Sequence, residues 1–447
     1  MPDFAPGLPD MQTYGDIRNF PAGELVPYAV QLHRARSAGK HYDIRVGGIA
    51  PGKTMSFATR KELPSETGQR ISLFQTPLHR ETYNYFQGEI PKGFRGAGSV
   101  RTHDLGSALI HKANDKPDRF TFTVAHRSDP QRYTIVRRPN SAKQWLLINT
   151  TPGKLDPLDR KKIKYQTISN NQVDKILDGK YMVQPKIDGA AAFYPINGKV
   201  EAHSYRESTK GRPIIHTERL GIQGIRLPNY KGTLLRGEIY GEQGGEAIAP
   251  QAVGGILNST IERSLRDQQA RKIHMKNYIF DVLKYKGRDV RGLPYEQRYD
   301  LLKDIVGQLP EDKFQLARGE TDVVKAKKLI RDIMLGKNKL TQEGVVAHPL
   351  GGGTPIKLKK VHDVDVRISG IFPGTGKYKD YAGGFEYMPS NGDKVVGKVG
   401  IGMNDYTRKD MMRNPEKYIG RRARIRSRGQ FDSGAHRAPS FIALHGG

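Results

Sequence analysis

The sequence contains no cysteine and only one tryptophan among its 447 residues. Without cysteine the chain can form neither a disulfide nor a cysteine-ligated zinc site, and this composition is typical of intracellular proteins. No apolar run approaches the roughly 20 residues that a membrane-spanning helix needs. The start Met1-Pro2-Asp3-Phe4 lacks the pattern of a signal peptide. We therefore expect a cytoplasmic protein without a membrane partner.

Acidic residues are also scarce relative to basic ones. The chain has 46 Asp and Glu against 74 Lys and Arg, which gives a net charge of +28 and an isoelectric point near 9.9. This excess is too large to serve only as a solvated surface, so it predicts a polyanionic partner such as nucleic acid. The length suffices for about three domains of roughly 150 residues each.

One apolar stretch, residues 183–189, delivers a single lysine, Lys186, followed by Asp188 and Gly189. A lysine at the end of a buried strand is costly unless it is paired or has a chemical task, and a lysine amine can act as a covalent nucleophile. Taken alone, this short string is better interpreted as an ordinary strand followed by a turn at Asp188-Gly189.

Four later stretches make a catalytic role for Lys186 the better interpretation, because each is an apolar strand that carries or adjoins a charge. They are residues 234–240 with Glu238, 278–283 with Phe280, 343–346 with Glu343, and 356–359 with Lys357 and Lys359. Taken separately, Phe280 would be assigned to the core and 356–359 to an amphipathic strand with a wet basic face. Helical patterns between them, such as 323–335 closing at Gly336, indicate an α+β domain.

In this order the five stretches resemble the nucleotidyltransferase motifs of ATP-dependent DNA ligases, which RNA ligases and mRNA capping enzymes share. The lack of cysteine argues against the NAD-dependent ligases, which carry a cysteine zinc module. The resemblance implies an α+β nucleotidyltransferase (ATP-grasp-like ligase) domain over residues 151–361, beginning with the basic connector 160–164.

The resemblance also implies roles for single residues. Lys186 would attack the α-phosphorus of ATP, and Glu343 would hold Mg²⁺. Two departures stand out, since Ala191 replaces the usual arginine five residues after the nucleophile and His348 replaces a lysine. Arg206 could carry part of the missing arginine's role. The implied ATP-binding residues are Gln184, Lys186, Arg206, Glu238, Phe280, Glu343, Lys357, Lys359 and Arg437.

Residues 1–27 are rich in proline and glycine and predict an irregular arm, whereas residues 28–150 show short strands separated by turn residues. The strands at 28–32, 42–46, 120–124, 133–136 and 145–148 predict a closed or nearly closed all-β unit. Within it, His41 and Asp43 alternate onto one strand face, as a metal site needs, and Arg45 follows on that face. A pair of histidines, here His33 and His41, is more often structural or solvated.

The histidine segment and the run Gly88–Gly98, which reads G-x-I-P-x-G-x-x-G-A-G, resemble the 3′-phosphoesterase module of bacterial end-joining ligases. The resemblance implies a β-barrel domain over residues 1–150, in which His33, His41 and Asp43 bind a manganese-type ion. Arg45, His79 and Tyr83 would engage the substrate phosphate, with His79 and Asp43 catalytic. The segment between the two histidines is two residues longer than in the family. A non-catalytic DNA-binding module is therefore the alternative for this domain.

Residues 362–447 show glycine-punctuated strands that predict a small barrel. Together with Arg437, in an R-x-P-x-F pattern, they resemble the OB-fold of small viral and bacterial ligases. Four arginines alternate with other residues and would share one strand face. They are Arg422, Arg424, Arg426 and Arg428. A solubilising face is the simpler interpretation, but four like charges side by side repel one another, so DNA phosphates lying across them are the better explanation.

Together these patterns predict a multidomain ATP-dependent DNA ligase that seals 5′-phosphate/3′-hydroxyl nicks through a lysyl-AMP intermediate, with 3′-end healing by the N-terminal domain. RNA ligase or capping-type nucleotidyl transfer is the nearest alternative. The expected cofactors are ATP and Mg²⁺, with Mn²⁺ in the N-terminal domain. The expected partner is nicked or broken double-stranded DNA, bound by a monomer in a bacterial or bacteriophage-infected cell.

Overall fold

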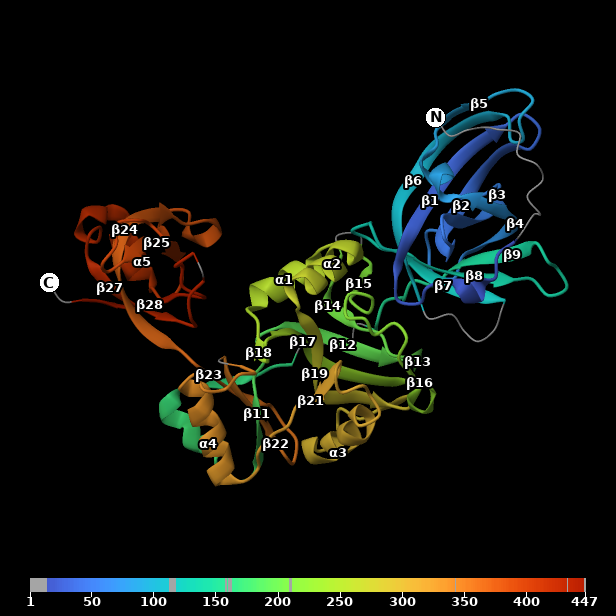
Figure 1. Cartoon of the computed structure of the whole chain (residues 1–447). Helices are drawn as coiled ribbons and strands as arrows, with labels where there is room; N and C mark the ends of the chain where they lie inside the picture. The colour runs from blue at the N-terminus through green and yellow to red at the C-terminus, as the bar shows by residue number, and fades with distance from the viewer. Residues whose placement is uncertain are drawn as a thin grey trace. The chain divides into compact units, whose positions relative to one another are not determined.

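The computed structural model describes residues 14–111, 118–156, 159, 163–208, 211–341, 343–431 and 433–445. The chain forms two compact units, each made of several segments. Figure 1 labels the helices and strands along the chain. The first comprises Met1–Ile163, Asp188–Ala317 and Leu350–Gly352, and the second comprises Lys164–Ile187, Arg318–Pro349 and Gly353–Gly447. Among the described helices, no segment is long and apolar enough to cross a membrane.

The first unit begins with a nine-stranded antiparallel sheet. Its strand order is β1-β2-β3-β4-β9-β8-β7-β6-β5, and β6 also pairs with β1. The short 3₁₀ helix η2, Glu81–Tyr85, follows β4. The strands are β1 Leu25–Ala35, β2 Gly39–Ala50, β3 Lys53–Thr59, β4 Arg70–Arg80, β5 Gly88–Ile90, β6 Gly98–Ile110, β7 Arg119–Val124, β8 Arg132–Arg137 and β9 Gln144–Asn149.

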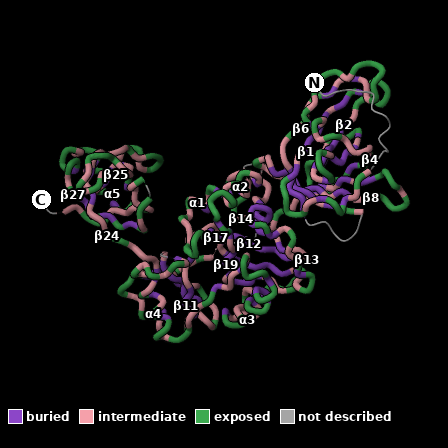
Figure 2. Tube along the Cα trace, viewed as in Figure 1, coloured by how far each residue is buried: buried purple, intermediate pink, exposed green. Residues whose placement is uncertain are grey.

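This sheet folds because its strands alternate apolar and polar residues, so that one face can leave water. On β4 the residues from Arg70 to Gln75 alternate between exposed and buried. The buried sides meet in an apolar core that includes Tyr28, Ile44, Phe57 and Phe122. Figure 2 shows buried stretches along these strands and exposed residues at the turns.

All five strands predicted between residues 28 and 148 are confirmed, and each lies inside or matches an observed strand. Four strands were missed, namely β3, β4, β5 and β6. The longest, β6, begins at Gly98, at the end of the glycine-rich motif, where the sequence looks like a loop. Of the predicted N-terminal arm, residues 1–13 lie outside the described part of the chain.

The first unit also contains an eight-stranded sheet with helices packed against it. The main order is β15-β14-β12-β17-β19-β20, with β18 beside β17 and β21 beside β19. The helices are α1 Pro250–Asn258, α2 Ile261–Arg271 and α3 Tyr295–Val306. The strands are β12 Ala190–Ile196, β14 His203–Glu207, β15 Pro213–Ile215, β17 Thr233–Gln243, β18 Glu246–Ala247, β19 His274–Tyr285, β20 Arg288–Asp289 and β21 Phe314–Leu316, with the separate pair β13 Gly198–Lys199 and β16 Arg226–Leu227.

A buried ion-pair network joins β8 of the nine-stranded sheet to residues beyond position 200. The Arg132 guanidinium donates to Glu201 Oε1 at 2.5 Å and to Glu218 Oε1 at 2.5 Å. Burial alone would raise the pKa of Glu218, but the Arg132 charge lowers it to about 2. The network is closed by His111 and Thr123, whose side chains lie 2.8 Å apart, with Thr123 donating to Glu218 at 3.1 Å.

The predicted basic connector is described only in part, because Arg160, Lys161 and Lys162 lie outside the described residues. Asp159, directly before the connector, is buried and accepts a hydrogen bond from Lys284 Nζ at 2.6 Å. The segment before Lys164 is therefore anchored at Asp159.

The second unit contains two sheets. In the first, the order is β10-β23-β22-β11, with helix α4, Val323–Met334, packed against β11 and β22. In the second, the order is β26-β25-β24-β27-β28, accompanied by helix α5, Asp405–Arg413. The strands are β10 Gln166–Ile168, β11 Tyr181–Pro185, β22 Gly344–Pro349, β23 Ile356–Lys359, β24 His362–Pro373, β25 Ala382–Pro389, β26 Gly397–Val399, β27 Arg422–Ser427 and β28 Ser440–Leu444.

Candidate functional site

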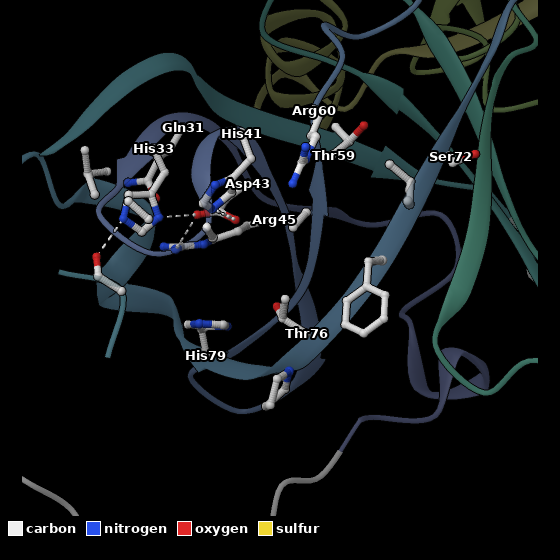
Figure 3. A pocket seen from close by; sticks show the side chains of 18 of the residues that line it. Gln31, His33, His41, Asp43, Arg45, Thr59, Arg60, Ser72, Thr76 and His79 are labelled. Carbon is white, nitrogen blue, oxygen red and sulfur yellow. Dashed lines mark hydrogen bonds and ion pairs between the residues drawn. The ribbon is translucent and has the colours of Figure 1, made fainter. Parts of the chain in front are cut away.

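Three predicted metal ligands converge on the hairpin formed by β1 and β2. The ligand atoms of His33, His41 and Asp43 all lie within 4.8 Å of one another. His33 Nδ1 is 3.4 Å from Asp43 Oδ2, and His41 Nε2 is 3.6 Å from Asp43 Oδ1. Figure 3 shows the three side chains pointing toward one another. Two imidazoles and one carboxylate form a donor set suited to a divalent transition metal.

The second nitrogen of each imidazole is fixed by a backbone carbonyl. His33 Nε2 lies 2.8 Å from Gly96 O, and His41 Nδ1 lies 2.9 Å from Gly39 O. A carbonyl oxygen can only accept, so these nitrogens are the donors, and in the neutral imidazoles the nitrogens that face Asp43 carry the lone pairs that a metal needs. The residues therefore fit a metal ion, because both histidines already present a ligand atom to one point.

Gly96 explains part of the glycine-rich motif. Its φ is +82°, and a Cβ at this position would lie 3.3 Å from the His33 ring. A glycine is therefore needed both for the backbone conformation and for the close approach of the imidazole.

The longer segment between the two histidines does not separate them. His33 is paired with His41 in the register of β1 and β2, and Ala35 is paired with Gly39. The additional residues lie in the turn between the strands, so the ladder alone sets the distance between the two imidazoles. The three side chains therefore converge despite the longer segment between the histidines.

Basic and aromatic groups surround the three ligands. Arg45 is buried, lies 3.8 Å from Asp43 Oδ2, and donates to the Tyr83 carbonyl at 2.7 Å. His79 and Tyr83 face each other edge-on, with ring centroids 6.1 Å apart. Burial, together with the Arg45 charge, lowers the pKa of His79 to about 4, so its imidazole is neutral at neutral pH.

One residue of this site was not predicted. Gln31 is fully buried and donates from Nε2 to the carbonyls of Tyr83 at 2.9 Å and Phe86 at 2.7 Å. It thereby holds the η2 segment against β1. The signal that could have found it is its spacing, since Gln31 precedes His33 by two residues and must share its strand face.

In the second unit, Lys186 follows β11 directly, where its amide donates to Gly344 O at 2.9 Å. Its Nζ donates to Glu343 Oε2 at 2.6 Å, and Lys359 Nζ donates to Glu343 Oε1. The Thr341 hydroxyl donates to the Lys186 carbonyl at 2.5 Å and accepts from the Glu343 amide at 3.0 Å. Three of the predicted ATP-binding residues, Lys186, Glu343 and Lys359, thus meet at one end of the four-stranded sheet.

The charges of this cluster are partly buried and mutually balanced. Burial would raise the pKa of Glu343, but the Lys186 ammonium, with help from Lys359, holds it below its ordinary value. Burial lowers the pKa of Lys359, and the Lys186 charge acts in the same direction. Lys357 shares its strand face with Lys359, and its Nζ lies 5.4 Å from the Tyr165 ring centroid.

Gln184 and His348 lie on neighbouring strands of the same sheet. Gln184 is buried on β11, opposite Val346. His348, the residue that replaces the expected lysine, is buried opposite Met182, four residues beyond Gly344 on β22. The structure therefore places His348 away from the strand end that carries Lys186.

The first unit carries three more predicted ATP-binding residues. Glu238 on β17 and Phe280 on β19 are half-buried, and Arg206 on β14 is exposed. Gly189, from the lysine motif, packs against β17, where a Cβ would lie 2.1 Å from Ile239 O and 3.1 Å from Glu238 Cγ. A side chain at position 189 would therefore push against the strand that carries Glu238.

The arginine-rich strand differs from the sequence interpretation in one respect. Arg422, Arg424 and Arg426 do share the exposed face of β27. However, Arg424 pairs with Asp365 and Arg426 with Asp363, each at 2.9 Å, on the neighbouring strand β24. The expected repulsion is thus already relieved within the protein for these two arginines.

The remaining two predicted basic residues of this region lie together beyond the strand. Arg428 follows the end of β27 at Ser427. Its amide donates to the Arg437 carbonyl at 3.0 Å, and the Arg437 amide donates to Gly429 O at 2.8 Å. Arg437 therefore belongs to the connection between β27 and β28.

Two known families match the segments of the chain that contain most of these residues. Residues 31–137 match the family described as DNA Ligase D 3′-phosphoesterase domain, and residues 164–352 match the family described as ATP dependent DNA ligase domain. The chain thus contains a domain of the ATP-dependent DNA ligase family, preceded by a domain of the DNA Ligase D 3′-phosphoesterase family.

The relatives are distant. The Mycobacterium tuberculosis multifunctional non-homologous end joining DNA repair protein LigD is 24% identical over 293 residues, which cover 63% of this chain and 35% of the relative. The Methanococcus vannielii DNA ligase is 24% identical over 250 residues, which cover 50% of this chain and 42% of the relative. The chain therefore spans about a third of the length of the LigD relative that it matches.

Solved structures of similar proteins include a Lig E DNA ligase studied for DNA binding with a minimal scaffold. Its TM-score is 0.46 at 18% identity, with 64% of this chain and all of that chain (100%) covered. The ligase domain of M. tuberculosis LigD gives a TM-score of 0.35 at 16% identity, with 63% of this chain and 94% of that chain covered.

Proposed function

We propose that this protein seals DNA nicks in three steps: adenylation of Lys186 by ATP, transfer of AMP to a 5′-phosphate, and attack by a 3′-hydroxyl that releases AMP. The observation that carries this proposal is the position of Lys186 inside the matched ligase domain, with its amine held by Glu343 beside the Lys359 ammonium. A lysine placed by a strand end and an ion pair is pre-oriented for covalent catalysis.

The other residues take roles that follow from their chemistry. Lys357, Lys359 and Arg437 are cations that neutralise phosphate oxygens of ATP. Phe280 is a half-buried ring suited to stacking on adenine, while Gln184 reads the base edge and Glu238 and Arg206 contact the ribose. Mg²⁺ held by Glu343 would supply further charge neutralisation at the phosphates.

The decisive experiment is incubation of the full chain with ATP labelled at the α-phosphate, followed by a denaturing gel and by mass spectrometry of the labelled peptide. AMP should be found on Lys186, and the adenylated protein should seal nicked DNA. AMP on another lysine would refute the assignment. Parallel assays on nicked DNA and nicked RNA separate a DNA ligase from an RNA ligase, and GTP in place of ATP tests a capping-type activity.

A second activity is supported by the N-terminal site. We infer that His33, His41 and Asp43 hold a divalent ion such as Mn²⁺ and that the domain removes a 3′-phosphate to leave the 3′-hydroxyl that sealing requires. The fixed tautomers of both histidines support metal binding. Buried Arg45, with neutral His79 and Tyr83 beside it, supplies the charge and the hydrogen bonds that a phosphate needs.

The test is a nick that carries a 3′-phosphate, offered with ATP, Mg²⁺ and Mn²⁺. The intact chain should seal it, and Asp43→Asn should not, while both should seal a nick with a 3′-hydroxyl. Asp104→Asn is a matched control, because Asp104 also pairs with a histidine of this sheet, His126 at 2.9 Å, outside the metal site. If the intact chain leaves the 3′-phosphate in place with several divalent metals, the domain serves to bind DNA instead.

We also propose the finer architecture. The pairing of β6 with β1 supports a closed β-barrel over residues 1–150. The strand order of residues 362–447 supports an OB-fold that holds DNA through Arg422 and Arg428, with residues 151–361 as the nucleotidyltransferase domain. A monomer is the expected state, and size-exclusion chromatography with light scattering tests it.

A further inference from the structure

The cavity that contains the three metal ligands is larger than a terminal phosphate requires. Its volume is about 1310 Å³, above the roughly 300–1,000 Å³ typical of sites that enclose a whole small molecule. Its lining continues from His33 and Asp43 to Arg60, Ser72 and Phe74. In Figure 3, the metal ligands lie at one side of the pocket, and Thr59, Arg60 and Ser72 lie toward the other.

Strand register explains how the cavity extends across the sheet. Asp43 on β2 is paired with Ala58 on β3, Ala58 with Phe74 on β4, and Phe74 with Gln144 on β9. Paired residues of an antiparallel sheet point to the same face. These four side chains therefore form one row that begins at the metal site and crosses three further strands.

The spacing of the strands sets the distance along this row. Neighbouring strands lie about 4.8 Å apart, so Phe74 is roughly 10 Å from Asp43. At about 3.4 Å per stacked nucleotide, this distance corresponds to roughly three nucleotides of one strand. Phe74 is therefore too far away to touch a phosphate at the metal site, but it is within reach of nucleotides upstream of that end.

The far half of the cavity is basic. It is lined by Arg60, Lys61, Arg70 and Arg138, and the Arg138 guanidinium donates to Ser72 Oγ at 2.9 Å. Of the described residues that line the whole cavity, Asp43 is the single carboxylate. A cavity with this charge distribution favours an extended anion over a neutral ligand.

Phe74 lines the cavity with an exposed aromatic ring. Its side chain is 51% exposed in the middle of β4, on the face that the cavity occupies, while Leu73 beside it is buried in the core. Phe74 thus leaves about half of its surface open to water. A water-exposed ring in a cavity that is also lined by arginines suits the stacking of an unpaired base while cations contact the backbone.

We propose that this far half binds the nucleotides immediately upstream of the 3′ end, with Phe74 stacked on a base about three nucleotides from the terminus and with Arg60 and Arg138 on backbone phosphates. The assignment of the 3′ end to the metal site rests on the proposed phosphatase function. The ligand is therefore a 3′-terminal stretch of unpaired nucleic acid, and the cavity selects frayed or overhanging ends over fully paired ones.

Photo-crosslinking tests the position of the strand without requiring catalysis. An oligonucleotide with a 3′-phosphate and 5-iodouracil at the third nucleotide from that end is irradiated with the full chain. Tryptic digestion then yields residues 71–80 as one peptide, because Arg70 and Arg80 are cleavage sites. The adduct should lie on Phe74 and should disappear in Phe74→Ala. Placing the iodouracil ten nucleotides from the end should give no adduct on this peptide.

Kinetics provide the second test. Phe74→Ala should raise KM for 3′-phosphate removal from an overhanging oligonucleotide by roughly 5- to 150-fold, the loss expected for one stacked base. It should leave KM for a mononucleoside 3′-phosphate unchanged, and Phe74→Trp should restore oligonucleotide binding. Arg60→Gln with Arg138→Gln should lower the slope of log KM against log salt by about 1.4, at about 0.7 for each lost contact. Arg101→Gln, at an exposed arginine of β6 outside the cavity, is the charge-matched control.

The two proposals fail in different ways. An adduct confined to other peptides, or an equal rise in KM for the mononucleotide and the oligonucleotide, would overturn the subsite. If no phosphate is released from any substrate while the adduct still forms on Phe74, the subsite stands and the phosphatase function is wrong.

Discussion

Arg132 gives the sharpest stability prediction, because one buried guanidinium balances two carboxylates. Its side chain is 9% exposed, and those of Glu218 and Glu201 are 3% and 16% exposed. Arg132→Met leaves both carboxylates without their cation. Breaking a buried pair in this way costs about 3–5 kcal/mol, since the remaining charge stays out of water. We expect the free energy of unfolding of this part of the chain to fall by that amount.

The pKa of Glu218 provides an independent magnitude. Its folded value of about 2 lies below its ordinary value of 4.5, which corresponds to roughly 3 kcal/mol of stabilisation by linkage. Because the folded pKa is depressed, this stabilisation is fully present above pH 4.5 and is lost as the pH falls toward 2. The difference in stability between the wild type and Arg132→Met should therefore be largest near neutral pH and should shrink below pH 4.5.

The assay uses the only tryptophan of the chain, Trp145. It is buried in the nine-stranded sheet and donates to Gln75 Oε1 at 2.9 Å, so its fluorescence reports on that sheet alone. In urea titrations, a loss of about 3 kcal/mol should lower the midpoint by about 1 M or more, given m values of roughly 1–3 kcal/mol per M.

Two variants separate this explanation from a general packing defect. Arg101→Met, at an exposed arginine of the same sheet, should leave the midpoint unchanged. Arg132→Met combined with Glu201→Gln and Glu218→Gln should recover most of the loss, because no buried charge then remains. A midpoint for Arg132→Met that equals the wild type at pH 7, or a loss that persists unchanged at pH 3, would refute the reasoning.

Three further predictions concern the proposed sites. His33→Ala should weaken Mn²⁺ binding by more than tenfold in isothermal titration calorimetry, and binding equal to wild type would exclude His33 as a ligand. Lys186→Ala should abolish AMP labelling and the sealing of ordinary nicks, while nicks supplied already adenylated should still be sealed in part; labelling of the variant would point to another nucleophile. Gly189→Ala should reduce adenylation by pressing a Cβ against the Ile239 carbonyl, and full activity with an unchanged melting temperature would show that the chain yields there.

Much of the fold could be predicted from the sequence where local pattern and local structure agree. Strand 120–124 alternates phenylalanine with threonine, and strand 145–148 is an apolar run whose residues alternate between buried and half-buried in the folded sheet. The helix at 323–335 was also expected, and α4 ends before Gly336, whose φ of +73° suits glycine. In contrast, β6 was missed because its first residues belong to a glycine-rich segment whose pairing partner, β1, is distant in sequence.

Candidate site residues could be proposed from residue type and order, whereas their hydrogen-bond partners could not. Asp43, Lys186 and Glu343 stand in recognisable local strings. Thr341, which holds the Lys186 carbonyl, stands in no such string, because it acts through a backbone atom 155 residues away.

Charge pairing across strands was also invisible in the sequence. Arg424 and Arg426 were predicted to contact DNA phosphates, whereas in the structure they pair with Asp365 and Asp363 on β24. The Arg132 network has the same origin, since its two carboxylates are 69 and 86 residues away along the chain. Periodicity within one segment carries no information on which segment will become its neighbour.

The register of the β1–β2 hairpin has a consequence for engineering and for motif searches. The hydrogen-bond ladder pairs His33 with His41. The distance between the two imidazoles therefore does not depend on the number of residues at the hairpin tip. An insertion after Arg36 should lengthen the turn without changing the pairing of the two histidines, and because Ser37 and Ala38 line the cavity, a fluorescent label at this tip would lie close to the proposed 3′-end site. Conversely, a search pattern that fixes the number of residues between the two histidines would overlook proteins in which the same ligand geometry is built on a longer or shorter turn.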